Sequence, residues 1–186
     1  MNLGLDISTS VIGICIFDDA SFVLMDKINL TKIKNIFEKA KFAEAFLLEI
    51  FSTYKITNVY IEDILLAFRR GMSSSRTLMQ LARFNGVISN IVYRSCGLMP
   101  VYINVNTARK SLGIKIDKNS SIDKKRQVLD WVDNDLGGYK WEEKIISRGK
   151  NKGSVKLENF CYDMSDSYVI CKAGIKINNG HNKQKT

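Results

Sequence analysis

The chain has 186 residues, a length that fits one domain. Apolar residues make up 45% and charged residues 25%, an ordinary composition for a folded protein that argues against bulk disorder. Lysine plus arginine exceed aspartate plus glutamate by 28 to 19, giving a net charge of +9. This charge favours a polyanionic partner such as nucleic acid, with solubility alone as the other explanation.

The sequence argues against membrane, secreted and zinc-binding classes of protein. No apolar run approaches the roughly 18 residues that a membrane helix needs. Asp6 interrupts the first apolar stretch, which lacks the positive region of a signal peptide. The four cysteines show no metal-ligand spacing. We therefore expect an intracellular protein with no membrane partner and no zinc site.

The pattern of apolar residues predicts an α/β domain. Alternation within residues 1–30 predicts three short strands in an antiparallel meander. Thr31 is the expected N-cap of a helix that runs through Phe51, and Asn106 that of a short later helix. The other expected elements are strands at 59–61 and 100–105 and helices at 76–96, 106–112, 122–136 and 158–172. This order predicts a five-stranded mixed sheet, the meander plus parallel strands, with helices on both faces.

The charge pattern divides the chain into a domain and a tail. We expect one domain over residues 1–173, with a basic insertion at about 137–157 that shows no clear period. Residues 174–186 are polar and basic and are expected to form a mobile tail.

Four carboxylates are notable for their positions. Asp6 lies within the apolar strand LGLDIST, and Glu62 ends the apolar strand VYIE. Asp163 and Asp166 are three residues apart and so share one face of the final helix. Carboxylates in apolar strands need a cationic partner, and a group of them without local Lys or Arg suggests Mg²⁺ or Mn²⁺. Two such ions about 4 Å apart would clamp the attacking and leaving oxygens of a phosphodiester.

Each carboxylate also has a simpler explanation. Asp6 could form a salt bridge or accept from the turn amides at 8–10, and Glu62 could be solvated. The pair in the final helix could be the exposed face of an amphipathic helix. The four together, in this order and on these elements, are more specific than any one of them.

Several segments resemble the RuvC group of Holliday junction resolvases, whose fold is RNase H-like. The segments are GLDISTSVIGICIFD, VYIED, MQLARFNGVI, PVYINVNTARKSLG, KKRQVL and DMSDSYVIC. The resemblance extends from Met1 to about Lys172. The long basic loop and the Lys- and Ile-rich composition are more similar to phage and viral members, which would act in the host cytoplasm.

This resemblance implies a metal-dependent, structure-selective DNA endonuclease that resolves four-way junctions. The four carboxylates would bind two Mg²⁺ or Mn²⁺ ions per active site. Lys125, or its neighbour Lys124, would neutralise the scissile phosphate. Arg109 or Lys110 is the nearest match to a further basic residue of the family. Paired cuts require two active sites, so we expect a homodimer, with the helix at 76–96 as the interface.

The loop after Glu62 carries candidate DNA contacts. Arg69, Arg70 and Arg76 suit phosphate groups, or could lie in a solvated surface loop. Phe68 could wedge into a junction by stacking on an unpaired base, or belong to the core. The basic stretch at 140–156 could hold a DNA arm by electrostatic attraction.

Two other classes of protein are consistent with parts of the sequence. One is a non-catalytic branched-DNA-binding module on the same scaffold, although an acidic cluster without metal would repel DNA. The other is an actin/hexokinase-type ATP-binding domain, because LGLDISTS is similar to the first phosphate loop of that superfamily. Against the latter, the chain is too short for two such domains and lacks a second Gly-rich loop.

Overall fold

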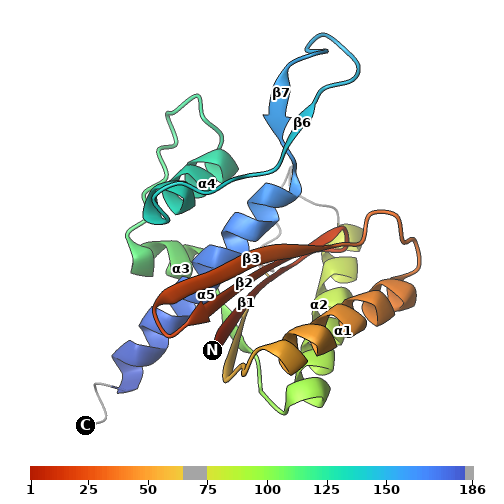
Figure 1. Cartoon of the computed structure of the whole chain (residues 1–186), viewed down its shortest axis with the longest axis vertical. Coiled ribbons are helices and arrows are strands. Elements are labelled where there is room, and N and C mark those ends of the chain that lie inside the picture. Colours follow the sequence, from red (N-terminus) through yellow and green to blue (C-terminus); the bar gives the residue numbers. More distant parts are fainter. Residues whose placement is uncertain (65–74, 183–186) are drawn as a thin grey trace.

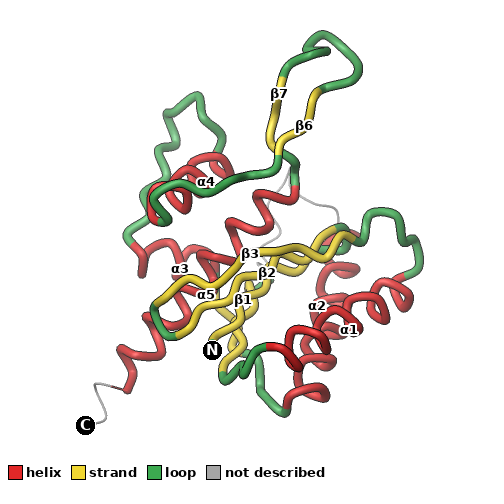
Figure 2. Tube along the Cα trace, viewed as in Figure 1, coloured by secondary structure: helices red, strands yellow, loops and turns green. Residues whose placement is uncertain are grey.

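The computed structural model describes residues 1–64 and 75–182 (Figures 1 and 2). Its strands are β1 (Asn2–Ile7), β2 (Val11–Asp18), β3 (Ser21–Asn29), β4 (Asn58–Glu62), β5 (Val101–Ile103), β6 (Glu143–Ile145) and β7 (Val155–Leu157). Its helices are α1 (Ile36–Thr53), α2 (Ser75–Cys96), α3 (Val105–Leu112), α4 (Lys124–Asp135) and α5 (Phe160–Asn182). Within these two ranges, none of the helices has the length and apolar character needed to span a bilayer.

Five strands form one mixed sheet in the order β3-β2-β1-β4-β5. β1, β2 and β3 pair antiparallel, whereas β4 runs parallel to both β1 and β5. Parallel neighbours need a crossover connection, and α1 and α2 lie in the two crossovers. The predicted α/β class, with a meander and parallel strands in one sheet, is confirmed.

Different helices cover the two faces of the sheet (Figure 1). Leu3, Leu5 and Ile7 of β1 belong to the core cluster shared with α1 and α2. The second core cluster joins α5 to α3 and α4 and to residues of the sheet such as Tyr60. Because side chains alternate along a strand, the even-numbered residues of β1, Asp6 included, point towards α5.

α5 lies unusually close to β1 and β2 because two glycines face it. A Cβ atom at Gly4 would lie 2.4 Å from Cβ of Cys171 and 2.5 Å from the carbonyl oxygen of Ser167. A Cβ atom at Gly13 would lie 2.0 Å from the carbonyl oxygen of Asp163. Only glycine therefore allows this contact, and Gly13 pairs directly with Asp6 across the strands.

Two helices begin at residues other than those expected. Asn35, rather than Thr31, caps α1, and its Oδ1 accepts from the backbone amides of Phe37 and Glu38. Thr31 instead donates to the side chain of Asn29. Asn104, rather than Asn106, caps α3 in the same way. In both cases the cap is the residue directly before the helix, and its side-chain oxygen accepts from two backbone amides of the first turn.

The final helix extends beyond Lys172, through residues expected to form a mobile tail. Gly174 packs against the ring of Tyr60, where an added Cβ would lie 2.4 Å from the ring carbons. Ile175 and Ile177 pack against the α5 core cluster. These apolar contacts continue the packed face of the helix as far as Ile177, and the helix itself ends at Asn182. The expected boundary at 173/174 lies inside this helix.

The basic insertion at 137–157 contains a two-stranded antiparallel hairpin, β6–β7, for which the sequence gives no clear signal. Its base is fixed to α4, because Asp133 Oδ1 accepts from the Trp141 indole at 2.9 Å and from the Tyr139 amide at 2.8 Å. The hairpin stands out beyond the N-terminal end of α5 (Figure 1). The chain thus presents its basic insertion as a protruding arm.

We expect the Gly4→Ala substitution to destabilise the protein by about 1–3 kcal/mol, the usual range for overpacking a filled core. The added methyl group meets the α5 backbone at Ser167 and Cys171, which cannot move aside as a flexible side chain could. Urea unfolding followed by circular dichroism measures the change.

Gly86→Ala is the matched control. Gly86 is exposed in the middle of α2, and nothing lies within 4 Å of the added Cβ. There we expect stabilisation by about 0.5–1 kcal/mol from helix propensity. Equal effects of the two substitutions would contradict a close contact between α5 and the sheet.

Candidate functional site

The candidate site lies where β1, β4 and α5 meet. Gly4 of β1 pairs in register with Tyr60 of β4, and both face α5. Two residues further along each strand, Asp6 and Glu62 must face the same side, because side chains alternate with a period of two. α5 begins at Phe160, so its first two turns bring further carboxylates to this edge.

Three of the expected carboxylates form a compact cluster. Asp6, Glu62 and Asp166 each present an oxygen, and these oxygens all lie within 4.8 Å of one another. Asp163 lies one turn earlier on α5 and outside this group of three, although its charge acts on Asp6. The sequence therefore predicts which strands and which helix supply the acidic side chains.

Burial and crowding raise the pKa values of these carboxyl groups. Burial raises the pKa of Asp6 well above its ordinary value, and the neighbouring carboxylates raise it further. Burial, with repulsion from Asp166, raises the pKa of Glu62 to about 7. Burial also raises the pKa of Asp163 to about 6 and shifts that of Asp166 upwards. Such a cluster is unfavourable when fully ionised unless cations compensate it.

Basic side chains supply part of that compensation. Arg109 Nη2 lies 3.5 Å from Asp166 Oδ1, and each of the two side chains is 12% exposed. Lys125, in the first turn of α4, lowers the pKa values of all four carboxyls by its charge. Lys124 has the same effect on Asp166. The pKa values remain raised, so the ionised cluster is still unfavourable and a further cation would stabilise it.

The donor set fits a hard divalent ion. Carboxylate oxygens are the ligands that Mg²⁺ and Mn²⁺ prefer, and three of them converge here within 4.8 Å of one another. Hydrogen bonds hold the ends of the strands in place. The buried Asn85 of α2 donates from its side-chain amide to the Glu62 carbonyl at 3.4 Å. The Asp63 amide donates to the Ile103 carbonyl of β5. The three clustered carboxylates therefore belong to regular elements rather than to loops.

The other expected site residues are distributed differently. Phe68, Arg69 and Arg70 lie outside the described residues. Arg76 is exposed in the first turn of α2. Lys110 is exposed on α3 and lines a neighbouring basic pocket.

Sequence reasoning missed Gly13, although it forms part of the site. Its missing side chain lets the first turn of α5 reach the strand beside Asp6. A glycine inside an otherwise apolar strand, VIGICIF, is the signal that could have identified a close backbone approach.

Comparison with known proteins supports the fold. No protein-family model matches the sequence, and no curated protein matches it. Thermus thermophilus RuvC in complex with a Holliday junction substrate is similar in structure, with a TM-score of 0.64 and 13% identity over 96% of this chain and 95% of that one. A further Thermus thermophilus RuvC structure has a TM-score of 0.59 and 12% identity, covering 96% of each chain.

The yeast mitochondrial Holliday junction resolvase Ydc2 is also similar, with a TM-score of 0.57 and 14% identity over 100% of this chain and 84% of that one. These likenesses extend over nearly the whole chain, including the segments that resemble the family in sequence. The expected resemblance to phage and viral members stays a prediction. The chain has the RNase H-like fold of the RuvC Holliday junction resolvases.

The raised pKa values predict a pH-dependent stability of the metal-free protein. A carboxyl group with a higher pKa in the folded than in the unfolded state stabilises the fold when protonated. For Glu62 this contribution is present below about 4.5 and is lost as the pH rises through about 7. In EDTA at pH 8, Glu62→Gln should therefore be more stable than wild type, by on the order of 2 kcal/mol.

Thermal unfolding in EDTA at pH 5 and pH 8 measures this effect. The advantage of Glu62→Gln should shrink at pH 5, where the wild-type carboxyl is protonated. Divalent ions should raise the wild-type midpoint more at pH 8 than at pH 5, because protons compete for the same oxygens. Glu143→Gln, an exposed acid on the hairpin, is the control. An equal gain from both substitutions at pH 8 would count against a crowded site.

Proposed function

We propose that the chain is a metal-dependent, structure-selective DNA endonuclease that resolves four-way junctions. The observation that carries this proposal is the convergence of Asp6, Glu62 and Asp166 within 4.8 Å on a RuvC-type fold. The net charge of +9 suits a polyanionic substrate. Fold alone would not identify the reaction, so the site carries the argument.

The four carboxylates are the proposed ligands of two ions, Mg²⁺ or Mn²⁺. Asp6, Glu62 and Asp166 already converge, and Asp163 is one turn away on the same helix. Bound there, the ions would activate a water for attack on the phosphodiester and stabilise the leaving 3′ oxygen, giving 5′-phosphate and 3′-hydroxyl ends. The strands and α5 supply rigid positions for the ligands.

Lys125 is the proposed partner of the scissile phosphate. It is exposed at the start of α4, and its charge acts on every carboxylate of the group. An exposed cation beside the cluster can meet a phosphate without losing a structural ion pair. Arg109, by contrast, is buried against Asp166 and orients that ligand.

DNA arms would be held by cations beyond the cluster. Arg148, Lys150 and Lys152 lie at the exposed tip of the β6–β7 hairpin, and none of them forms a salt bridge within the described residues. Arg76 is exposed at the start of α2. Phe68, Arg69 and Arg70 stay proposed contacts from the sequence. Phosphate contacts of this kind position the substrate without reading its sequence.

Paired incision favours a homodimer with α2 at its interface, since a twofold axis places two sites against opposite strands. Met79 and Tyr93 are large apolar side chains exposed on α2, consistent with an interface there. Light scattering at micromolar concentration should give twice the 21.1 kDa chain mass. A monomeric mass would contradict the proposed assembly.

The reaction itself is tested with purified protein and labelled DNA. A four-way junction is compared with a linear duplex, a flap and an RNA–DNA hybrid, each in Mg²⁺, Mn²⁺ or EDTA. Symmetric paired nicks on the junction, absent in EDTA, are the expected result. Binding without cutting in either metal would contradict the enzyme and favour a DNA-binding module.

Asp6→Asn should abolish junction cleavage, by at least about 10³-fold, while junction binding stays equal or becomes tighter. The substitution removes one ligand charge and one source of repulsion towards DNA but keeps the side-chain shape. Single-turnover cleavage and fluorescence anisotropy measure the two effects. Cleavage that persists in Mg²⁺ or Mn²⁺ would overturn the site assignment.

Lys125→Ala should slow cleavage by about 10²-fold, the usual effect of removing one transition-state charge contact, with a smaller loss of binding. Arg126→Ala is the control, because Arg126 lies next on α4 but pairs with Asp130. Equal losses of binding and rate in Lys125→Ala would make this lysine a docking residue instead.

A further inference from the structure

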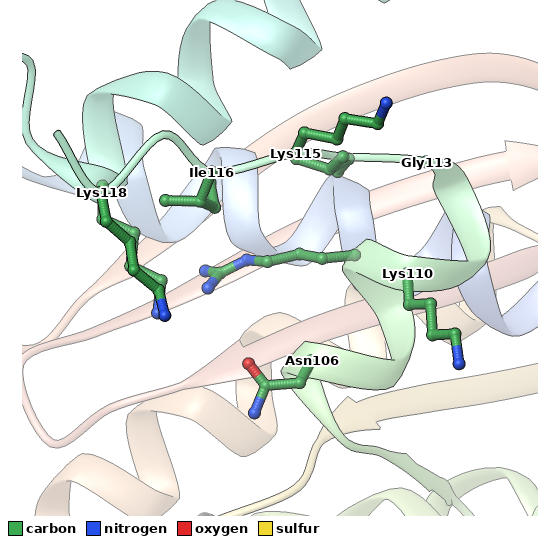
Figure 3. A pocket seen from close by; sticks show the side chains of 9 residues that line it. Asn106, Lys110, Gly113, Lys115, Ile116 and Lys118 are labelled. Carbon is green, nitrogen blue, oxygen red and sulfur yellow. The ribbon is translucent and has the colours of Figure 1, made fainter. Parts of the chain in front are cut away.

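A basic pocket lies beside the carboxylate cluster, between α3, the loop after it and the start of α4 (Figure 3). Its volume is about 480 Å³. The lining residues are Asn106, Arg109, Lys110, Gly113, Ile114, Lys115, Ile116, Lys118 and Lys124. Five of these nine are cationic and none is acidic, so the pocket suits an anion.

Arg109 joins this pocket to the carboxylate cluster. One end of its guanidinium faces Asp166, at 3.5 Å. Its Nε is buried and has no hydrogen-bond partner within the described residues. A buried N–H without an acceptor costs free energy, and a bound anion would supply the missing acceptor. The pocket wall therefore contains an unused donor next to the reacting site.

The loop that forms the pocket is held in place by its own hydrogen bonds. Gly113 ends α3 in a left-handed conformation, and the Ile114 amide donates to the Arg109 carbonyl at 2.9 Å. Gln127 of α4 binds both the amide and the carbonyl of Asp117, at 2.8 and 2.9 Å. The cations at positions 115 and 118 are thus carried on a fixed loop.

Lys115 and Lys118 are exposed and take part in no salt bridge within the described residues. Figure 3 shows the two side chains extending from the loop in different directions, Lys118 downwards and Lys115 upwards, so they present their charges at different parts of the pocket's edge. Ile116 lies between them in sequence and lines the same pocket. The pocket thus combines cationic side chains with the apolar side chain of Ile116. This combination suits a nucleotide, because its phosphate is charged and its sugar and base are less polar.

We propose that this pocket binds a nucleotide of the cleaved DNA strand next to the scissile phosphodiester. The inference rests on the proposed nuclease function and adds a strand-holding subsite to it. The phosphate meets Lys118 and the Arg109 Nε, Lys115 adds positive charge at the pocket's edge, and the sugar or base lies against Ile116. Arg109 then contacts the strand on one side and Asp166 on the other, so strand binding and ligand orientation share one side chain.

The test compares two charge reversals of equal size. Lys115→Glu/Lys118→Glu alters the pocket, whereas Lys41→Glu/Lys55→Glu alters two exposed lysines of α1 and the loop after it, in the part of the fold that covers the other face of the sheet. Both pairs also carry Asp6→Asn, so that binding is measured without cleavage. Anisotropy with a labelled four-way junction in EDTA, across a salt series, is the readout.

We expect the pocket pair to weaken junction binding at least tenfold, and the control pair by less than threefold. The slope of log K against log salt should fall by about 1–2 in the pocket pair, as for the loss of one or two phosphate contacts. Circular dichroism and thermal unfolding should show both pairs folded. In the background with Asp6 intact, the pocket pair should raise KM more than it lowers kcat.

Other results would overturn the proposal. If both pairs weaken junction binding equally, the effect comes from the overall charge of the protein and not from this pocket. If Lys115→Glu/Lys118→Glu binds the junction as tightly as the protein without these two changes, the proposed subsite is wrong, although the nuclease function could still hold. Titration with ATP, dTMP and inorganic phosphate tests whether the pocket binds a free ligand instead. Suppose that one of them binds, that only the pocket pair abolishes this binding, and that junction binding is unchanged. The pocket would then be a site for that free ligand and not for the DNA strand. No junction binding by any variant would reject the nuclease and the subsite together.

Discussion

The close packing of α5 on the sheet determines both the core on this face and the position of the carboxylate cluster. Glycine at positions 4 and 13 lets the helix lie directly on β1 and β2, closer than any side chain would allow. The same helix carries Asp163 and Asp166 in its first two turns, and Gly13 pairs with Asp6 across the strands. One packing arrangement therefore closes the core on this face and brings carboxylates from distant parts of the chain together.

This arrangement has an electrostatic cost that the fold compensates only in part. Buried carboxyls that crowd one another acquire raised pKa values, to about 7 for Glu62. Arg109 and the lysines at the start of α4 reduce the repulsion without cancelling it. Groups held in an unfavourable state at a regular, well-packed position are typical of functional sites. A bound cation would relieve the repulsion, so metal binding and fold stability are linked.

The sequence predicts the regular parts of this protein better than its boundaries. Alternation in β1 and β2 and the helical spacing in α1 reflect burial, which acts on every second or every third to fourth residue. Helix ends depend on a few local hydrogen bonds, which the apolar pattern does not contain. The caps are therefore Asn35 and Asn104 and not the expected Thr31 and Asn106. The extension of α5 beyond Lys172 depends on packing against Tyr60, a residue more than 100 positions away, which no local pattern contains. Asp6 and Glu62 could be predicted as site residues because carboxylates in apolar strands are rare. The clustering of these two with Asp166 but not with Asp163, and the basic pocket beside the cluster, depend on tertiary geometry.

Diffraction from crystals soaked in Mn²⁺ would show whether α5 and the sheet together form a divalent-ion site. We expect anomalous density between Asp6, Glu62 and Asp166, with the Arg109–Asp166 contact kept or lengthened as the carboxylate turns to the ion. We also expect the density to disappear in Asp6→Asn. Clear Mn²⁺ density elsewhere, with none at these three carboxylates, would contradict this site.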